Sequence, residues 1–456
     1  MERKKKVIDI NEKTPLYLLS LPMFFELFLN ILLNNVDTLM LSHYSDTAVG
    51  AVGNANQMMM FIILMFNIIA TATSVVVAQY LGAKDIGHMN MIYTLAMVVN
   101  LVFGVVLSGI MVLGRNVFLD IMQVQPEMKK EASLYILIVG GLLFFQACYN
   151  VMLQILRCNG YTKVGMYVSI IMNIINIIGN YAFLYGPLKH YNLGVAGVAI
   201  STVVARGVAL LVAITVFIKV KIGKISLKYI RPFPTAFLVQ MLKIGLPTAG
   251  ENMCYNMYQL VLMSFVNRMG QDAVNARIYC QSLIQFAMIF SNSQGMATQI
   301  ITGHLVGAGK EDAAYKRVFK TLRSSLPITF CLATINMLIS PFTIRIFTSN
   351  ENIIKLGFTI MLVDVFLELG RCLNVTVGSS LKASGDYLYM FFVGVISMWG
   401  LGATVGYIMG LGIGLGVAGV YIGTATDECI RGIVLLYRWY KKKWYGKGIV
   451  EKKELS

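Results

Sequence analysis

Apolar stretches of about 20 residues or more recur along the whole of this 456-residue chain. Each is long enough to cross the roughly 30 Å hydrocarbon core of a bilayer as an α-helix. Inside lipid, every backbone polar group must be paired within the chain, which restricts spanning structures to helices and closed barrels. Only 13% of the residues are charged, against about a quarter in soluble domains. The sequence therefore predicts an all-α protein that crosses the membrane many times.

The apolar stretches fall into two sets of six, separated by a basic segment from Lys219 to Pro234. We expect membrane spans near residues 16–42, 48–80, 90–114, 130–156, 162–185, 194–219, 237–267, 273–306, 318–340, 353–381, 387–411 and 414–438. The predicted division is an N-terminal six-helix bundle over 1–221, a linker over 222–235, a C-terminal six-helix bundle over 236–442 and a tail over 443–456.

The two sets of spans share one sequence framework. Leu21-Pro22 and Glu26 return as Leu246-Pro247 and Glu251, a shift of 225 residues. Further matches follow in order: Ala48-Val49 with Ala273-Val274, Gly82-Ala83 with Gly307-Ala308, Leu156-Arg157 with Leu381-Lys382 and, at a shift of 222, Leu193-Gly194-Val195 with Leu415-Gly416-Val417. Because each set has an even number of spans, both sets run in the same direction. This predicts twelve transmembrane helices in two parallel bundles related by pseudo-twofold symmetry.

The net charge of +16 is concentrated in alternate loops, which include Lys84, Lys224, Lys310 and the run from Lys441 to Lys443. The positive-inside rule then places both termini in the cytoplasm. Anionic lipid headgroups explain this charge better than a nucleic acid does. We therefore expect membrane lipids as partners and no nucleic acid.

Motifs for ATP hydrolysis or for enzyme chemistry are missing. The phosphate-binding loop needs a Gly-Lys pair followed by Ser or Thr, and no Gly-Lys pair in this chain is so followed. The four histidines are isolated, and there is no HExxH pattern. An ion gradient is thus the expected energy source, a membrane-embedded enzyme fits poorly, and no catalytic residues are assigned.

The first span carries a stripe of polar residues. Glu26, Asn30, Asn34 and Asp37 stand at spacings of four, four and three, which places them on one helix face. Ionisable residues inside a span are costly and usually functional. A carboxylate such as Asp37, partly removed from water, suits the binding and release of a proton or the ligation of Na⁺; the alternative is a structural hydrogen-bonding residue.

Neutral oxygen ligands occur in the fifth and sixth spans. Asn173, Asn176 and Asn180 lie on one face of the fifth, and Thr202 follows in the sixth. Amides and hydroxyls can hold a hard cation or a carboxyl proton beside an acid. They also join helices by hydrogen bonds, which is the structural alternative.

The second half has its own charged residues. Glu251 begins a polar segment that includes Asn256, and Asp364, Glu368 and Arg371 cluster in the tenth span. Opposite charges at these spacings reduce the cost of burial by pairing. A structural ion pair and a transport role are equally compatible with this cluster.

Several segments together resemble the multidrug and toxic compound extrusion (MATE) family, bacterial branch. They are Pro22, Val36-Asp37-Thr38-Leu39-Met40, Asp46-Thr47-Ala48-Val49, Gln79-Tyr80-Leu81-Gly82-Ala83, Asn176 to Tyr185 with Gly186, and Leu193 to Thr202. The resemblance covers nearly the whole chain. It implies a V-shaped pair of six-helix bundles that exchange mostly cationic, amphipathic compounds for Na⁺ or H⁺.

The resemblance also implies a coupling site. The acid that the family carries in its first helix falls on Asp37, its fifth-helix pair on Asn176 and Asn180, and its sixth-helix threonine on Thr202; a coupling Na⁺ would bind among these four. Some members carry an acid in the tenth helix, at the position where this chain has Arg371. Some also carry an acid in the seventh helix, and Glu251 lies earlier in that helix than this acid does. A second cation site is therefore not carried over, and coupling is expected in the first bundle.

The function expected is secondary active efflux of small organic cations, with no cofactor beyond the coupling Na⁺ or H⁺. The alternative is a flippase for a lipid-linked or polysaccharide precursor, which would need a larger and more cationic cavity. We expect a monomer in the bacterial plasma membrane. Substrate or gating contacts are expected from Glu26, Asn30, Asn34, Asn173, Glu251, Asn256, Glu368 and Arg371.

Overall fold

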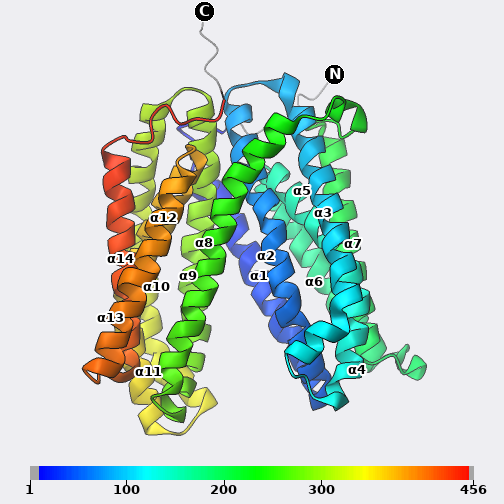
Figure 1. Cartoon of the computed structure of the whole chain (residues 1–456), viewed down its shortest axis with the longest axis vertical. Coiled ribbons are helices and arrows are strands. Elements are labelled where there is room, and N and C mark those ends of the chain that lie inside the picture. Colours follow the sequence, from blue (N-terminus) through cyan, green and yellow to red (C-terminus); the bar gives the residue numbers. More distant parts are fainter. Residues whose placement is uncertain (1–9, 451–456) are drawn as a thin grey trace, which may run out of the picture. The chain divides into compact units, whose positions relative to one another are not determined.

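The structure is a computed structural model that describes residues 10–450, apart from the side chain of Asn34. Within that range every regular element is a helix and no strand occurs (Figure 1). The predicted all-α class is confirmed. Twelve long helical segments follow one another along the chain, in the order of the predicted spans.

The first half contains α1 (Leu16–Ser42), α2 (Asp46–Gly82), α3 (Ile86–Ile121), α4 (Pro126–Tyr135), η1 (Ile136–Gly140), α5 (Phe144–Cys158), α6 (Thr162–Leu184), η2 (Lys189–Tyr191) and α7 (Val195–Val220). Here α4, η1 and α5 together form the fourth span, which bends by 45° at its break. The π-helical η1 and the turn after it divide what the apolar pattern predicts as one continuous helix.

The second half contains η3 (Leu227–Ile230), α8 (Thr235–Asn267), α9 (Gln271–Gly307), α10 (Glu311–Phe347), α11 (Glu351–Ala383), α12 (Tyr387–Ser397), η4 (Met398–Ala403), α13 (Thr404–Tyr407), η5 (Ile408–Gly412) and α14 (Gly416–Tyr440). The run from α12 to η5 forms the eleventh span. Its π-helical turns coincide with five glycines from residue 400 to residue 412, which lower the cost of leaving regular α geometry.

Among the described residues, seven helices are long and apolar enough to be recognised as membrane spans, or eight if the bent fourth span counts as one. The long helices below that threshold are α8, α9, α11 and α14. These four carry charged side chains within their apolar stretches, such as Glu251, Arg277, Asp364 and Asp427, which lower their mean hydropathy. Because most of the buried charges on these helices lie in ion pairs inside the protein, the helices can still lie in a membrane.

Contacts divide the described chain into two compact units. One comprises Phe25–Val77 and Asp85–Gly245; the other comprises Ile10–Phe24, Ala78–Lys84 and the described part of Leu246–Ser456. We call them the N-terminal and C-terminal units. Neither is continuous in sequence, because the first residues of α1 and the last turn of α2 pack with the second half. The boundaries predicted at residues 221 and 236 remain predictions.

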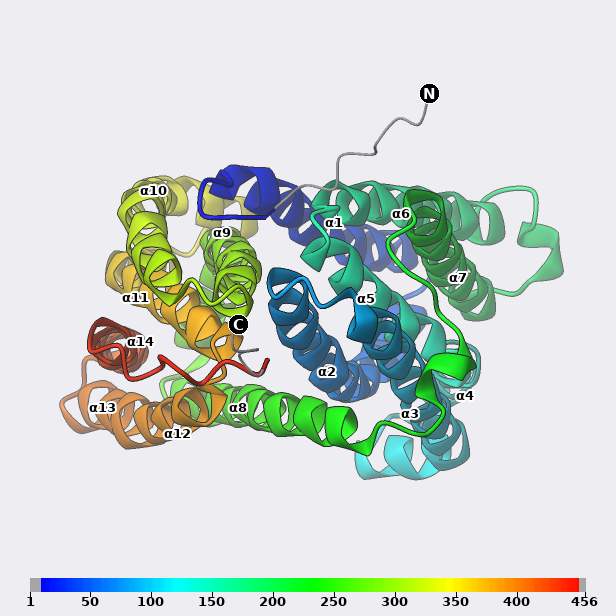
Figure 2. The same cartoon turned by 90° about the horizontal axis from the view of Figure 1, so that it is seen from above.

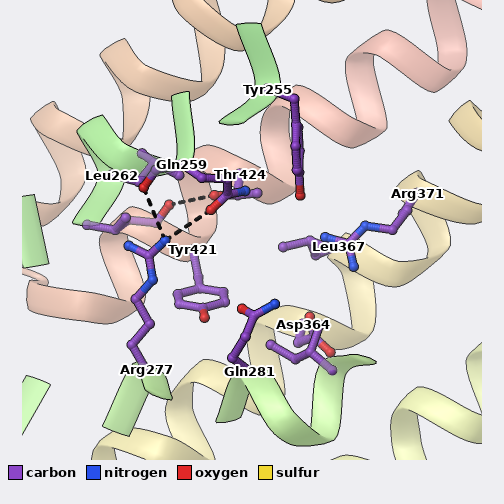
Figure 3. Close-up of a pocket in the computed structure, with 12 residues that line it drawn as sticks. Tyr255, Gln259, Leu262, Arg277, Gln281, Asp364, Leu367, Arg371, Tyr421 and Thr424 are labelled. Carbon is purple, nitrogen blue, oxygen red and sulfur yellow. Dashed lines mark hydrogen bonds between the residues drawn. The ribbon is translucent and has the colours of Figure 1, made fainter. Parts of the chain in front are cut away.

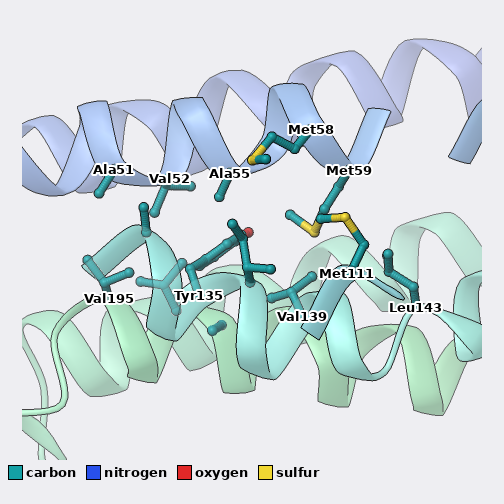
Figure 4. Packing of buried hydrophobic residues seen from close by; sticks show 14 of the residues in the cluster. Ala51, Val52, Ala55, Met58, Met59, Met111, Tyr135, Val139, Leu143 and Val195 are labelled. Carbon is teal, nitrogen blue, oxygen red and sulfur yellow. The ribbon is translucent and has the colours of Figure 1, made fainter. Parts of the chain in front are cut away.

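Each unit has its own apolar core. In the N-terminal unit, Ala51, Ala55 and Met59 of α2 face Tyr135 and Val139 of the bent fourth span (Figure 4). Small alanines alternate with large side chains, which allows the helices to approach closely. In the C-terminal unit, α11 packs against α9, α10 and α14 (Figure 2).

A reciprocal glycine contact joins the last turns of α2 and α9 within the C-terminal unit. A Cβ added to Gly82 would lie 2.0 Å from the backbone oxygen of His304, and one added to Gly307 would lie 1.9 Å from that of Gln79. Both pairs of positions differ by the repeat shift of 225 residues. The helices therefore touch backbone to backbone, and only glycine allows this separation.

The segment after α14 packs against the same place. Gln79 Nε2 donates to the backbone oxygen of Ala383 at 2.6 Å, and Gln79 Oε1 accepts from the backbone nitrogen of Ile449 at 2.7 Å. Lys447 Nζ lies 2.6 Å from Asp386 Oδ1. These bonds tie the chain beyond α14 to the end of α2 and to the residue before α12, and they tie the end of α2 to the end of α11.

Candidate functional site

A row of hydrogen bonds links the side chains on which the family resemblance falls, all in the N-terminal unit. Asn180 Nδ2 donates to Asp37 Oδ1 at 2.8 Å and to Asn176 Oδ1 at 3.1 Å. Asn176 Nδ2 in turn donates to Thr202 Oγ1 at 3.2 Å. The row crosses from α1 through α6 to α7. The structure thus brings together Asp37, Asn176, Asn180 and Thr202.

Local sequence explains how this row forms. Asn176 and Asn180 are one turn apart on α6, so their amides lie one above the other. Both are buried, whereas Asp37 and Thr202 are partly buried. Thr202 also donates to the backbone oxygen of Val198 at 3.0 Å, which fixes its hydroxyl on the face of α7 toward α6. Asn180 Oδ1 is buried with no hydrogen-bond partner among the described residues, so the row still has an oxygen free to accept.

Arg206 is a member of this site that the sequence-based set of coupling residues omits. It stands one turn after Thr202 on α7, and its guanidinium interacts electrostatically with Asp37 and with Tyr135. The Tyr135 hydroxyl contacts Thr202 and Asn56. The signal that could have found Arg206 is its spacing of four from Thr202, which places both on one helix face.

The other polar residues of α1 lie apart from this row. Glu26 is buried and accepts from Arg157 Nη2 of α5 at 2.5 Å. Asn173 Nδ2 donates to the backbone oxygen of Leu29 at 3.0 Å, which attaches α6 to α1. Asn30 is half-buried on α1, and the side chain of Asn34 lies outside the described residues. The expected substrate or gating roles of these residues remain predictions.

The Glu26–Arg157 ion pair has a repeat counterpart. Lys382 Nζ lies 3.4 Å from Glu251 Oε2 in the C-terminal unit. Lys382 is the repeat counterpart of Arg157 and Glu251 that of Glu26, each at a shift of 225 residues. The first helix of each half is thus joined by a charge pair to the span three helices later. A buried charge that loses its partner is strongly destabilising, so each pair fixes the position of two helices.

We expect Arg157→Ala to lower the free energy of unfolding by about 3–5 kcal/mol, because Glu26 would be left buried and charged. The double variant Glu26→Gln/Arg157→Gln should recover most of that loss. Thermal unfolding of the purified protein in detergent measures both. Lys382→Ala is the matched comparison, and its effect should be smaller because that pair is longer and less deeply buried. An unchanged melting temperature in Arg157→Ala would contradict a stabilising role for this ion pair.

The C-terminal unit contains a chain of buried ion pairs between α11 and α14. Arg371 pairs with Glu368, and its Nε lies 3.7 Å from Glu428 Oε1. Arg431 Nη2 lies 3.1 Å from Glu428 and 3.0 Å from Asp427. These contacts show how the charges in the tenth span are accommodated. Asn256 donates instead to a backbone oxygen of its own helix, α8, at 2.8 Å.

A small cavity of about 30 Å³ lies beside this chain of ion pairs (Figure 3). Its polar lining comes from four helices: Tyr255 and Gln259 of α8, Arg277 and Gln281 of α9, Asp364 and Arg371 of α11, and Tyr421 and Thr424 of α14. Arg277 Nη2 donates to Gln259 Oε1 at 3.0 Å. The cavity is thus lined by polar side chains of the second half, among them Arg371, which stands where some family members have an acid.

Comparisons with known proteins support a common family for the whole chain. The MatE family model matches residues 22–182 and again residues 247–408, so the two matches begin one repeat shift apart. The uncharacterized transporter YisQ of Bacillus subtilis is 36% identical over 434 residues, which are 95% of each chain. A probable multidrug resistance protein NorM of Thermotoga maritima is 25% identical over 463 residues, covering 99% of this chain and 97% of the relative.

Solved structures agree in fold. An outward-facing multidrug resistance MATE family transporter superposes with a TM-score of 0.87 at 20% identity, covering 97% of this chain and 98% of the other. A MOP superfamily transporter from Pyrococcus furiosus gives the same TM-score, identity and coverage. The parallel arrangement of helices is therefore one already seen in multi-pass transporters.

Proposed function

The chain belongs to the MatE family of transporters, and on that premise we propose that it exports cationic, amphipathic compounds in exchange for Na⁺ or H⁺. The hydrogen-bonded row from Asp37 to Thr202 supports this proposal most directly. The row includes the Asp37 carboxylate, which lies inside a helix bundle. A cation that binds there neutralises the negative charge of this carboxylate. Such a site can respond to an ion gradient.

The row fits either coupling ion. For Na⁺ it offers hard oxygen ligands: the Asp37 carboxylate, the buried and unpaired Asn180 Oδ1, and the Thr202 hydroxyl. For H⁺ it offers a carboxylate that exchanges its proton within a hydrogen-bonded row. Arg206 competes with both ions for Asp37. Binding of the coupling ion would therefore release Arg206 from Asp37, which links ion binding to the position of α7 against α1.

The proposed orientation has both termini in the cytoplasm of a bacterial cell, because the basic loops lie on one side of the predicted spans. Organic cations would then be taken from the cytoplasm. We propose that a single chain performs the cycle, since two bundles of one chain supply the two parts that alternate.

The experiment uses purified protein in liposomes loaded with a fluorescent organic cation. Na⁺ and pH gradients are imposed separately, and release is followed with time. Stimulation by one gradient, abolished when that gradient is dissipated, supports the proposal and identifies the coupling ion. Release that ignores both gradients contradicts coupled antiport.

A further inference from the structure

The chain beyond α14 packs across one end of the C-terminal unit. We call residues 441–450 the C-terminal strap, which is drawn in red after α14 in Figures 1 and 2. Trp444 of the strap stacks on Trp439 of α14 with ring centroids 4.0 Å apart, and both rings are at most 1% exposed. Trp444 Nε1 also donates to the backbone oxygen of Trp439 at 3.3 Å. Burial of the two indoles therefore fixes the start of the strap on the unit.

The middle of the strap is held by two acids in the first turn of α10. Lys442 Nζ lies 2.8 Å from Asp312 Oδ1, and the Tyr445 hydroxyl donates to the same oxygen at 2.8 Å. The backbone nitrogen of Gly446 donates to Glu311 Oε1 at 3.0 Å. All of these bonds lie at exposed positions, where water competes for both partners and each contact is individually weak. This part of the strap can therefore be released.

The strap then crosses the turn between α11 and α12 in backbone contact. Gly385 has a φ of +93°, and a Cβ added there would lie 2.0 Å from the backbone oxygen of Lys447. Lys447 Nζ reaches Asp386, the next residue of that turn, at 2.6 Å. Asp386 keeps a second partner without the strap, because Arg438 Nε of α14 lies 2.6 Å from its other oxygen. Release of the strap would thus not leave this buried carboxylate alone.

The end of the strap reaches the last turn of α2, a helix of the first half. Gln79 is 0% exposed, and its amide is bonded at both ends: Nε2 donates to Ala383, and Oε1 accepts from the backbone nitrogen of Ile449 at 2.7 Å. A Cβ added to Gly448 would lie 3.6 Å from the same oxygen and 3.3 Å from Val306 of α9. The strap therefore supplies one of the two bonds that hold this buried side chain in the C-terminal unit.

The helix that the strap contacts is shared by the two units. α2 is continuous from Asp46 to Gly82, yet its residues up to Val77 belong to the N-terminal unit and those from Ala78 belong to the C-terminal unit. A movement of one unit against the other must either bend α2 next to Val77 or free its last turn. Contacts that hold this turn consequently oppose such a movement.

We propose that the C-terminal strap is a releasable latch on α2. In the resting protein it holds the last turn of α2 in the C-terminal unit, and it detaches when the units move against each other during transport. The bonds in its middle are weak enough for release, while the stacked tryptophans keep its start in place. The part that detachment plays in transport rests on the proposed function. The hold on α2 is a separate property that can be measured without transport.

Hydrogen–deuterium exchange of the whole protein in lipid nanodiscs, read by mass spectrometry, tests the hold. A chain that ends at Tyr445 lacks the bond to Gln79, and its backbone amides in Ala78–Lys84 should exchange about tenfold faster than in the wild type. A chain that ends at Val450 is the matched control and should exchange as the wild type does. The amides of α14 should be unchanged in both chains, which shows that the unit stays folded. Equal exchange of Ala78–Lys84 in the two truncated chains overturns the proposal.

A point variant tests the same bond without shortening the chain. Ile449→Pro removes the backbone N–H that Gln79 accepts, so exchange in the last turn of α2 should become faster. Ile449→Ala keeps this N–H and should have a smaller effect. Exchange at the wild-type rate in Ile449→Pro overturns the hold of the strap on Gln79.

Cross-linking tests the release. Ala83 stands one turn after Gln79, to whose backbone oxygen its nitrogen donates at 2.9 Å. The double variant Ala83→Cys/Ile449→Cys is joined with a short bis-methanethiosulfonate reagent, and each single variant treated in the same way is the control. Efflux from liposomes should fall to the rate of liposomes without protein and recover when a reductant removes the link.

The outcomes separate this proposal from the proposed function. Efflux at the wild-type rate by the cross-linked protein means that the strap never detaches, which overturns the latch. A wild type without gradient-driven efflux contradicts the proposed function, and the exchange measurements still decide whether the strap holds α2.

Discussion

Asp37→Asn is expected to reduce gradient-driven efflux to the rate of liposomes without protein. The amide keeps the shape of the carboxyl and can still be held by Asn180, but it neither binds a proton nor carries a negative charge. Arg206 loses its electrostatic partner at the same time. Efflux of a fluorescent cation under the gradient that drives the wild type measures the effect.

Two observations accompany this measurement. The variant should elute and unfold as the wild type does, since its volume and hydrogen bonding are nearly conserved. Asp46→Asn is the matched control, because Asp46 is exposed in the first turn of α2 and its replacement should leave efflux unchanged. Undiminished coupled efflux in Asp37→Asn would remove Asp37 from the coupling mechanism.

Gly82→Leu should have the second largest effect. Even a Cβ at this position would lie 2.0 Å from a backbone oxygen, and backbone cannot move aside as a flexible side chain does. The last turns of α2 and α9 would have to separate. We expect efflux to be nearly lost in Gly82→Leu, and Gly82→Ala to lower stability by about 1–3 kcal/mol, the usual cost of overpacking.

Thermal unfolding and efflux of the same preparations measure these effects. Gly53→Ala is the control on the same helix, because nothing lies within 4 Å of an added Cβ there. Gly307→Ala should behave as Gly82→Ala does, since the two contacts are reciprocal. Normal efflux in Gly82→Leu would show that the two helix ends separate freely during the cycle.

Much of the architecture could be predicted because the membrane restricts the options. Apolar length alone predicts helices, and the repeat predicts two sets of six. The breaks inside the fourth and eleventh spans could not be predicted in this way. An apolar run such as Tyr135 to Leu143 has the same composition whether it is α-helical or bent through a π turn, because tertiary packing selects between the two.

The candidate site was predictable where its residues share a helix. Asn176 and Asn180 fall on one face by spacing alone, and the family resemblance connected them with Asp37 and Thr202. The partners that lie on other helices were not predictable. Arg157 and Glu26 are 131 residues apart, and the repeat analysis matched each with its counterpart without indicating that they pair. The interaction of Arg206 with Asp37 was not predictable either, because it depends on how α1, α6 and α7 pack.

The reciprocal contact between the ends of α2 and α9 also bears on the origin of the chain. Gly82 touches the counterpart of Gln79, and Gly307 touches Gln79 itself. This is the pattern of an isologous interface, in which the same patch on two identical subunits meets about a twofold axis. A half-length ancestor with six helices would already have carried both sides of the contact. Fusion of two such genes would then have made a homodimer into one polypeptide, after which the interiors of the two halves were free to evolve separately.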